Sequence, residues 1–153
     1  HERGRRPGTV NVGGAVGLAT ALQLAEESRP EESDRLRALR DQLIAGVLAR
    51  IPDSRLPGHR RHRLAHHASF AFPGIEGESI VQALDMEGIA ASSGAACAEG
   101  EPEPSFVLNA LGLPPTWGIG GLRLTLGRAN DEADVLRVLD ILPGIVEGLR
   151  KDT

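Results

Sequence analysis

The stretch Gly121-Leu-Arg-Leu-Thr-Leu126 alternates between apolar and polar side chains at every step. Successive side chains of a β-strand point to opposite faces, so the three leucines share one face and Arg123 and Thr125 share the other. An apolar strand face must be buried against another layer of secondary structure. The stretch therefore predicts a strand with one buried face and with Arg123 on the opposite face.

The segments outside this strand complete an α+β pattern. His67–Phe72 alternates in the same way and is stopped by Pro73-Gly74, which predicts a second strand, and Ile89–Ala91 predicts a short third one. Apolar residues at helical spacing predict the helices. The order predicts a small, mostly antiparallel sheet with helices packed on one face. The predicted helices span residues 12–27, 33–51, 78–87, 104–111 and 131–150.

Several boundaries follow from single residues. Pro30 is expected to separate the first two helices, since proline lacks the backbone N–H and clashes with the preceding turn. Gly88 is expected to end the third helix, and Asn130 to cap the last one, which Pro143 should kink. The glycine- and proline-rich residues 112–120, which hold Trp117, are expected to form a loop.

Length and charge limit the class of protein. The 153 residues suit one domain, residues 1–153, and the net charge of −4 gives no basic footprint for nucleic acid. The short basic stretch His59–Arg63 is interpreted as a solvated loop, with a phosphate-binding patch as the alternative. The sequence contains no run of 18 apolar residues that would indicate a membrane span. A cytoplasmic protein is therefore expected. The chain begins with His rather than Met, which favours a piece of a longer protein.

Cys97 is the only cysteine, so an internal disulfide is excluded. Its neighbours in 91–104 are small or turn-forming, whereas a packing cysteine usually lies among bulky apolar residues. We expect a reactive thiol on a loop that can move, with an incidental surface cysteine as the alternative. His59, His62, His66 and His67 lack a cysteine or carboxylate at ligand spacing, so no metal site is predicted.

Five segments in order resemble the C-terminal part of pyridoxal-phosphate-dependent cysteine desulfurases of the nitrogen-fixation and iron–sulfur-cluster type, in the class V aminotransferase superfamily. The resemblance implies the small domain of a fold-type I enzyme, with residues 1 to about 12 linking it to a preceding cofactor domain. The segments are His1–Thr9, Gly77–Ser79, Ile89–Cys97, Glu103–Leu113 and Leu122–Arg128.

The resemblance assigns a role to three residues. Cys97 matches the nucleophile that takes sulfur from L-cysteine as a persulfide and leaves L-alanine. Arg123 matches the arginine that binds the α-carboxylate of the substrate, and Thr9 matches a threonine that reaches the cofactor phosphate of the other subunit in a homodimer. The sulfur would pass to an acceptor or scaffold protein for iron–sulfur clusters or for tRNA thiolation.

Two departures from the family pattern qualify these roles. Ala95 and Ala98 stand where the family often has Ser or Thr, and the cofactor lysine is absent, since the single lysine is Lys151 in a polar tail. The chain alone should therefore be inactive. A stand-alone sulfur-carrier or interaction module, and a related selenocysteine lyase or class V aminotransferase, remain as alternatives.

Overall fold

The computed structural model describes residues 4–5, 8–93 and 104–151. The predicted nucleophile Cys97 lies outside these described residues. The chain divides into two compact units, His1–Ser33 and Asp34–Thr153.

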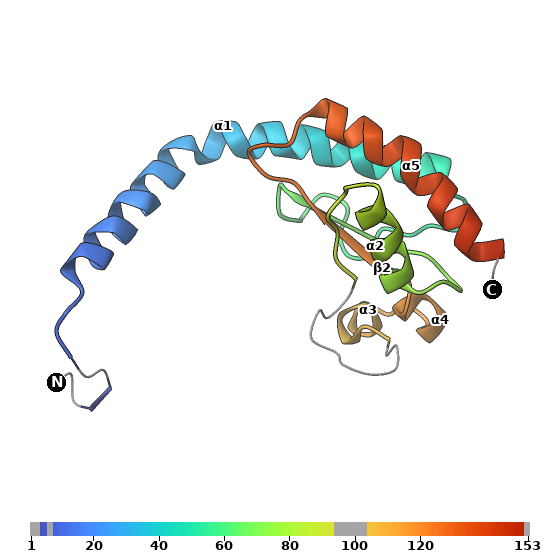
Figure 1. Ribbon diagram of the computed structural model, residues 1–153, viewed down its shortest axis with the longest axis horizontal. Helices are drawn as coiled ribbons and strands as arrows, with labels where there is room; N and C mark the ends of the chain where they lie inside the picture. The colour runs from blue at the N-terminus through green and yellow to red at the C-terminus, as the bar shows by residue number, and fades with distance from the viewer. Residues whose placement is uncertain (1–3, 6–7, 94–103, 152–153) are drawn as a thin grey trace. The chain divides into compact units, whose positions relative to one another are not determined.

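Helix α1 (Val12–Arg50) provides the regular structure of the first unit and continues into the second (Figure 1). The predicted break at Pro30 is wrong, because the helix continues through it. An internal proline costs about 3 kcal/mol, and side-chain pairs one turn apart act against that cost. Gln23 donates to Glu27 at 2.9 Å, and Arg29 forms an ion pair with Glu26 at 2.6 Å.

In the described part of the second unit, two antiparallel strands form the sheet. Strand β1 (His67–Ala71) pairs with strand β2 (Gly121–Thr125) so that Ser69 lies opposite Arg123. Ala68, Phe70, Leu122 and Leu124 are buried on one face, as the alternation predicts. The predicted strand at 89–91 is wrong, since residues 89–91 belong to no strand and the next residue, Ser92, makes an isolated bridge to Arg123.

Within the described residues, the second unit has four further helices: α2 (Gly77–Met86), α3 (Phe106–Ala110), α4 (Pro115–Gly118) and α5 (Glu132–Lys151). Helix α4 lies in the segment predicted to be a loop, where Trp117 packs under the guanidinium of Arg55. Gly88 has a φ of +72° just beyond α2, which confirms its predicted position at the helix end. The predicted cap Asn130 instead accepts from the Gly127 N–H, and the Asp131 carboxylate accepts the first free N–H groups of α5.

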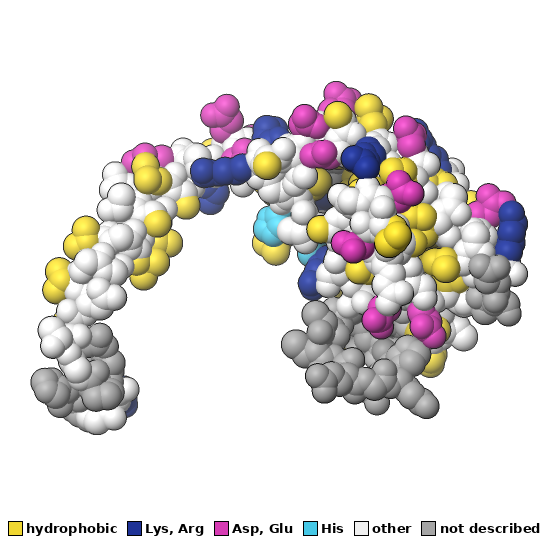
Figure 2. Space-filling model, viewed as in Figure 1, with side chains coloured by type: hydrophobic (Ala, Val, Ile, Leu, Met, Phe, Trp, Pro, Cys, Tyr) yellow, Lys and Arg dark blue, Asp and Glu magenta, His cyan; other side chains and the backbone are white. Residues whose placement is uncertain are grey.

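The core lies between these helices and the sheet. Helix α5 runs beside the second half of α1, while α2 packs against both α5 and β2 (Figure 1). Arg50 of α1 donates to the Leu139 carbonyl of α5 at 2.8 Å. Basic and acidic side chains are interspersed over the visible surface of the second unit (Figure 2). Among the described residues, no helix is both long and apolar enough to cross a membrane.

Two glycines let the start of β2 approach neighbouring backbone. A Cβ at Gly77, in the first turn of α2, would collide with the carbonyl oxygen of Gly121, and the Gly77 N–H donates to the Ile119 carbonyl at 2.8 Å. A Cβ at Gly120 would collide with the carbonyl oxygen of Phe72. Only a residue without a side chain allows α2 and the end of β1 to lie this close to β2.

We predict that Gly77→Ala lowers the free energy of unfolding by about 1–3 kcal/mol, because the added methyl meets backbone that cannot rotate away. Gly148→Ala in α5 is the matched control, since its Cβ would enter open space and alanine favours helix by up to about 1 kcal/mol. Thermal unfolding of both variants in the intact protein tests this. Equal midpoints for the two variants would contradict it.

Candidate substrate site

Arg123 is fixed through its backbone on both edges of β2. Its N–H donates to the Ser92 carbonyl at 2.7 Å, and the Ser92 N–H donates to the Arg123 carbonyl at 3.1 Å. On the other edge, Arg123 lies opposite Ser69 of β1. A residue held on two sides directs its side chain with little backbone freedom.

The Arg123 side chain is exposed on the face of β2 opposite the core. Its Nη2 donates to Ser92 Oγ at 3.1 Å. Among the described residues, no carboxylate forms an ion pair with it. The planar fork of a guanidinium in this state can bind a carboxylate through two parallel hydrogen bonds.

A hollow of about 300 Å³ lies beside Arg123. Ser69 and His67 of β1 line one side, and the short helix α3 lines another. Ser105 fixes that helix, since its N–H donates to the Gly118 carbonyl at 3.0 Å and its Oγ caps the Leu108 N–H at 3.4 Å. The hollow joins a cationic group to an apolar wall, which suits a small amphipathic anion. The apolar lining comes from Phe106, Val107, Leu108, Leu111 and Leu122.

His67 is a site residue that the sequence analysis did not assign. It shares the Arg123 face of the sheet, two residues along β1 from Ser69. Its partial burial lowers the pKa of the imidazole, and the positive charges of Arg63 and Arg123 lower that pKa further. The lowered pKa favours the neutral imidazole, so Arg123 supplies the positive charge of the site. Counting alternate residues from the buried Phe70 would have placed His67 on this face.

The structure brings Arg123 together with Ser92, Ser69 and His67, but it does not test the other predicted roles. Thr9 lies in the unit His1–Ser33, after Gly8, whose φ of +95° favours glycine. Among the described residues, no group of three or more His, Cys, Asp or Glu side chains is arranged to hold a metal ion.

Lys151 does not fit the role of a pyridoxal-phosphate anchor. Its Nζ forms an ion pair with Glu147 at 2.7 Å in the last turn of α5, and that hydrogen bond raises the pKa of the amine. The cofactor aldehyde reacts with a neutral amine, which an acidic partner disfavours. No other lysine is present in the sequence. The chain therefore holds donors for anionic groups but no residue to anchor the cofactor covalently.

Comparisons with known proteins agree on one family. The family model described as aminotransferase class-V matches residues 2–138. A cysteine desulfurase of Gluconacetobacter diazotrophicus is 49% identical over 98% of this chain, and an IscS-like cysteine desulfurase of Mycobacterium tuberculosis is 47% identical over 98%. The chain spans 38% of the length of each of these two relatives.

Solved structures give the same result. A NifS-like protein superposes with a TM-score of 0.79 at 29% identity, over 97% of this chain and 37% of that one. The cysteine desulfurase CsdA of Escherichia coli superposes with a TM-score of 0.69 at 25% identity, over 94% of this chain and 33% of that one.

The lowered pKa of His67 predicts a pH-dependent stability. Below the unfolded value of 6.5, the unfolded state binds a proton more readily than the folded state, so stability falls as the pH drops towards the folded pKa. We expect His67→Asn to flatten this dependence in thermal unfolding between about pH 7.5 and about pH 5. The control Ser69→Ala, on the same sheet face, should retain the wild-type slope. An unchanged slope in His67→Asn would refute the assignment.

Proposed function

Because the chain belongs to the aminotransferase class-V family, we propose that it is the C-terminal small domain of a cysteine desulfurase. In this proposal residues 1–153 form that domain, and residues 1 to about 12 link it to a cofactor domain. The whole enzyme would transfer sulfur from L-cysteine to Cys97 and release L-alanine. Pyridoxal phosphate would be anchored by a lysine outside this chain.

The observation that supports the proposal best is the state of Arg123. The guanidinium is oriented by Ser92, has no carboxylate partner among the described residues and borders a hollow of amino-acid size. Binding the α-carboxylate there would orient the substrate, and the apolar wall would limit the water around it. His67 lies on the same face as Arg123, and its lowered pKa favours an uncharged ring. It therefore adds a polar group to the site without a second positive charge.

Chain connectivity limits how far Cys97 can lie from this site. Cys97 follows Ser92 by five residues in the sequence, and five fully extended residues span at most about 18 Å. Ser92 itself contacts Arg123 through backbone and side chain. A thiol on this tether can reach a substrate held by Arg123, while the small residues around it suit a segment that changes position.

The sulfur transfer balances without a further redox partner. The Cys97 thiolate attacks the sulfur of the substrate cysteine, so an S–S bond forms and the Cβ–S bond breaks. The electron pair of that bond stays on the carbon skeleton, which takes up a proton and leaves as alanine. Bound pyridoxal phosphate supplies the electron sink that allows the Cβ–S bond to break. Arg123 holds the carboxylate throughout.

Several finer features belong to the same proposal. Thr9 would donate to the cofactor phosphate of a second subunit, so the enzyme would be a homodimer. The persulfide would pass to an acceptor or scaffold protein for iron–sulfur clusters or tRNA thiolation in the cytoplasm. The similarity to cysteine desulfurases of the IscS type supports the sulfur-transfer part of this proposal.

Cys97→Ser in the full-length enzyme should abolish sulfide release from L-cysteine, because a hydroxyl cannot form a persulfide. The cofactor absorbance should remain, since the substitution leaves cofactor binding intact. Sulfide assay and absorption spectra measure the two effects. Sulfide release at the wild-type rate would refute the role of Cys97. If selenide release from selenocysteine also continued, the selenocysteine-lyase alternative would gain support.

Arg123→Ala should raise the KM for L-cysteine roughly 10- to 100-fold, since a hydrogen-bonded charge contributes about 1.5–3 kcal/mol. Ser92→Ala should raise it by a smaller factor, because it removes only the group that orients the guanidinium. Arg137→Ala is the control, as Arg137 lies on α5 and donates to the Glu87 carbonyl. Steady-state kinetics distinguish the three variants. An Arg123→Ala enzyme with wild-type KM would contradict the assignment.

A further inference from the structure

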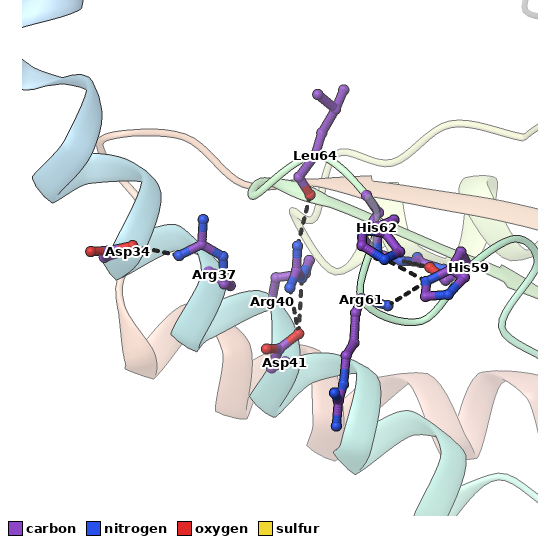
Figure 3. Close-up of polar contacts among 9 residues, drawn as sticks. Asp34, Arg37, Arg40, Asp41, His59, Arg61, His62 and Leu64 are labelled. Carbon is purple, nitrogen blue, oxygen red and sulfur yellow. Dashed lines mark hydrogen bonds and ion pairs between the residues drawn. The ribbon is translucent and has the colours of Figure 1, made fainter.

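The basic loop between α1 and β1 is closed by its own side chains. His59 Nδ1 accepts from the backbone N–H groups of Arg61 at 3.0 Å and His62 at 2.9 Å (Figure 3). Arg63 donates to the carbonyls of His59 at 3.0 Å and Pro57 at 2.9 Å. The stretch predicted to be a solvated loop therefore has a defined conformation, and this conformation sets where Arg60 and Arg61 lie.

Arg40 joins this loop to α1. Its side chain is 2% exposed, and Nη1 donates to the Leu64 carbonyl at 2.9 Å (Figure 3). Its other nitrogens donate to one oxygen of Asp41 at 2.7 and 2.9 Å. Within the described part of the chain, the buried guanidinium of Arg40 has one ionic partner, the half-exposed Asp41. Its positive charge is therefore only partly balanced by negative charge.

Arg63 adds to this imbalance. Its Nη1 is buried and, among the described residues, has no hydrogen-bond partner. Burial lowers the pKa of the Arg63 guanidinium, and the charge of Arg40 lowers it further, while Asp41 acts in the opposite direction. Two cations thus share one carboxylate, and an additional anion close by would relieve their repulsion.

A hollow of about 560 Å³ opens between α1 and the loop. Arg37 and Arg40, one helical turn apart on α1, line one wall, and Arg60 and Arg61 line the other. Arg37 is paired with Asp34. In the described part of the chain, the guanidiniums of Arg60 and Arg61 have no hydrogen-bond or ionic partner. Besides these four cations, the lining contains Asp41, Ile44 and Ala45.

We propose that this hollow binds an acidic polypeptide segment of a partner protein, with Arg60 and Arg61 pairing its carboxylates. Arg37 and Arg40 are already paired with acids of α1. Arg60 and Arg61, whose side chains have no partner among the described residues, therefore supply the binding charge. Two separate side chains suit two spaced carboxylates better than one compact anion. Ile44 and Ala45 add alkyl surface for the side chains between those charges. A nucleic acid is disfavoured, because the net charge of the chain is −4 and the lining offers no aromatic ring for base stacking.

The test measures binding of a fluorescein-labelled peptide of about eight residues, alternating Glu and Ala, to the full-length protein by fluorescence anisotropy at about 50 mM salt. We expect saturable binding that weakens with added salt. Arg60→Ala combined with Arg61→Ala should raise the Kd about tenfold or more. The control combines Arg137→Ala with Arg150→Ala, removes the same charge outside the hollow, and should change the Kd by less than about twofold.

Three results would overturn the proposal. The first is an absence of saturable binding to the wild-type protein. The second is an equal loss in the test and control variants, which would show an effect of net charge alone. The third is a single-stranded RNA of equal charge that binds more tightly through Arg60 and Arg61. Thermal midpoints within about 2 °C of wild type confirm that both double variants are folded. The result does not depend on whether Cys97 accepts sulfur.

Discussion

Strand β2 is bonded along both edges, and the remainder of the second unit is arranged around that constraint. β1 pairs with one edge, Ser92 with the other, and α2 approaches its start through Gly77. The leucines of β2 pack in the core, so the opposite face of the strand, which carries Arg123, is turned away from the core. The position of the substrate-binding candidate is thus a consequence of how the core is closed. A strand held less firmly would leave the guanidinium without a fixed direction.

Local patterns in the sequence predicted most of the second unit. Alternation around Arg123 identified β2 and its buried face, and Gly88 was correctly placed at the end of α2. The errors arose where distant contacts or summed local effects decide the outcome. Pro30 remains within α1, where side-chain pairs one turn apart act against its cost, and Ile89–Ala91 makes no ladder bond to β2, which only the neighbouring Ser92 contacts. Rules that consider one residue at a time cannot predict either outcome.

The site was predictable only in part for a similar reason. Arg123 followed from its strand and from the family resemblance, whereas its contact with Ser92 joins segments 31 positions apart. Sequence spacing groups His67 with the loop histidines, and its partial burial follows only from the pairing of β1 with β2. The loop at His59–Arg63 is mostly exposed, as predicted, but composition does not show that a ring nitrogen and the buried Arg40 give it one conformation. The roles predicted for Cys97 and Thr9 rest on the family resemblance.

The ion pair between Lys151 and Glu147 at the end of α5 affects how the chain can be labelled chemically. Sixteen of the seventeen basic residues are arginine, so amine-reactive dyes and cross-linkers meet a single side-chain target in this chain, Lys151. That target is exposed and already oriented by Glu147. A fluorophore attached there would report from one known position without modifying a guanidinium. Glu147 raises the pKa of the Lys151 amine and would slow the coupling at neutral pH, so a mildly alkaline buffer suits the reaction.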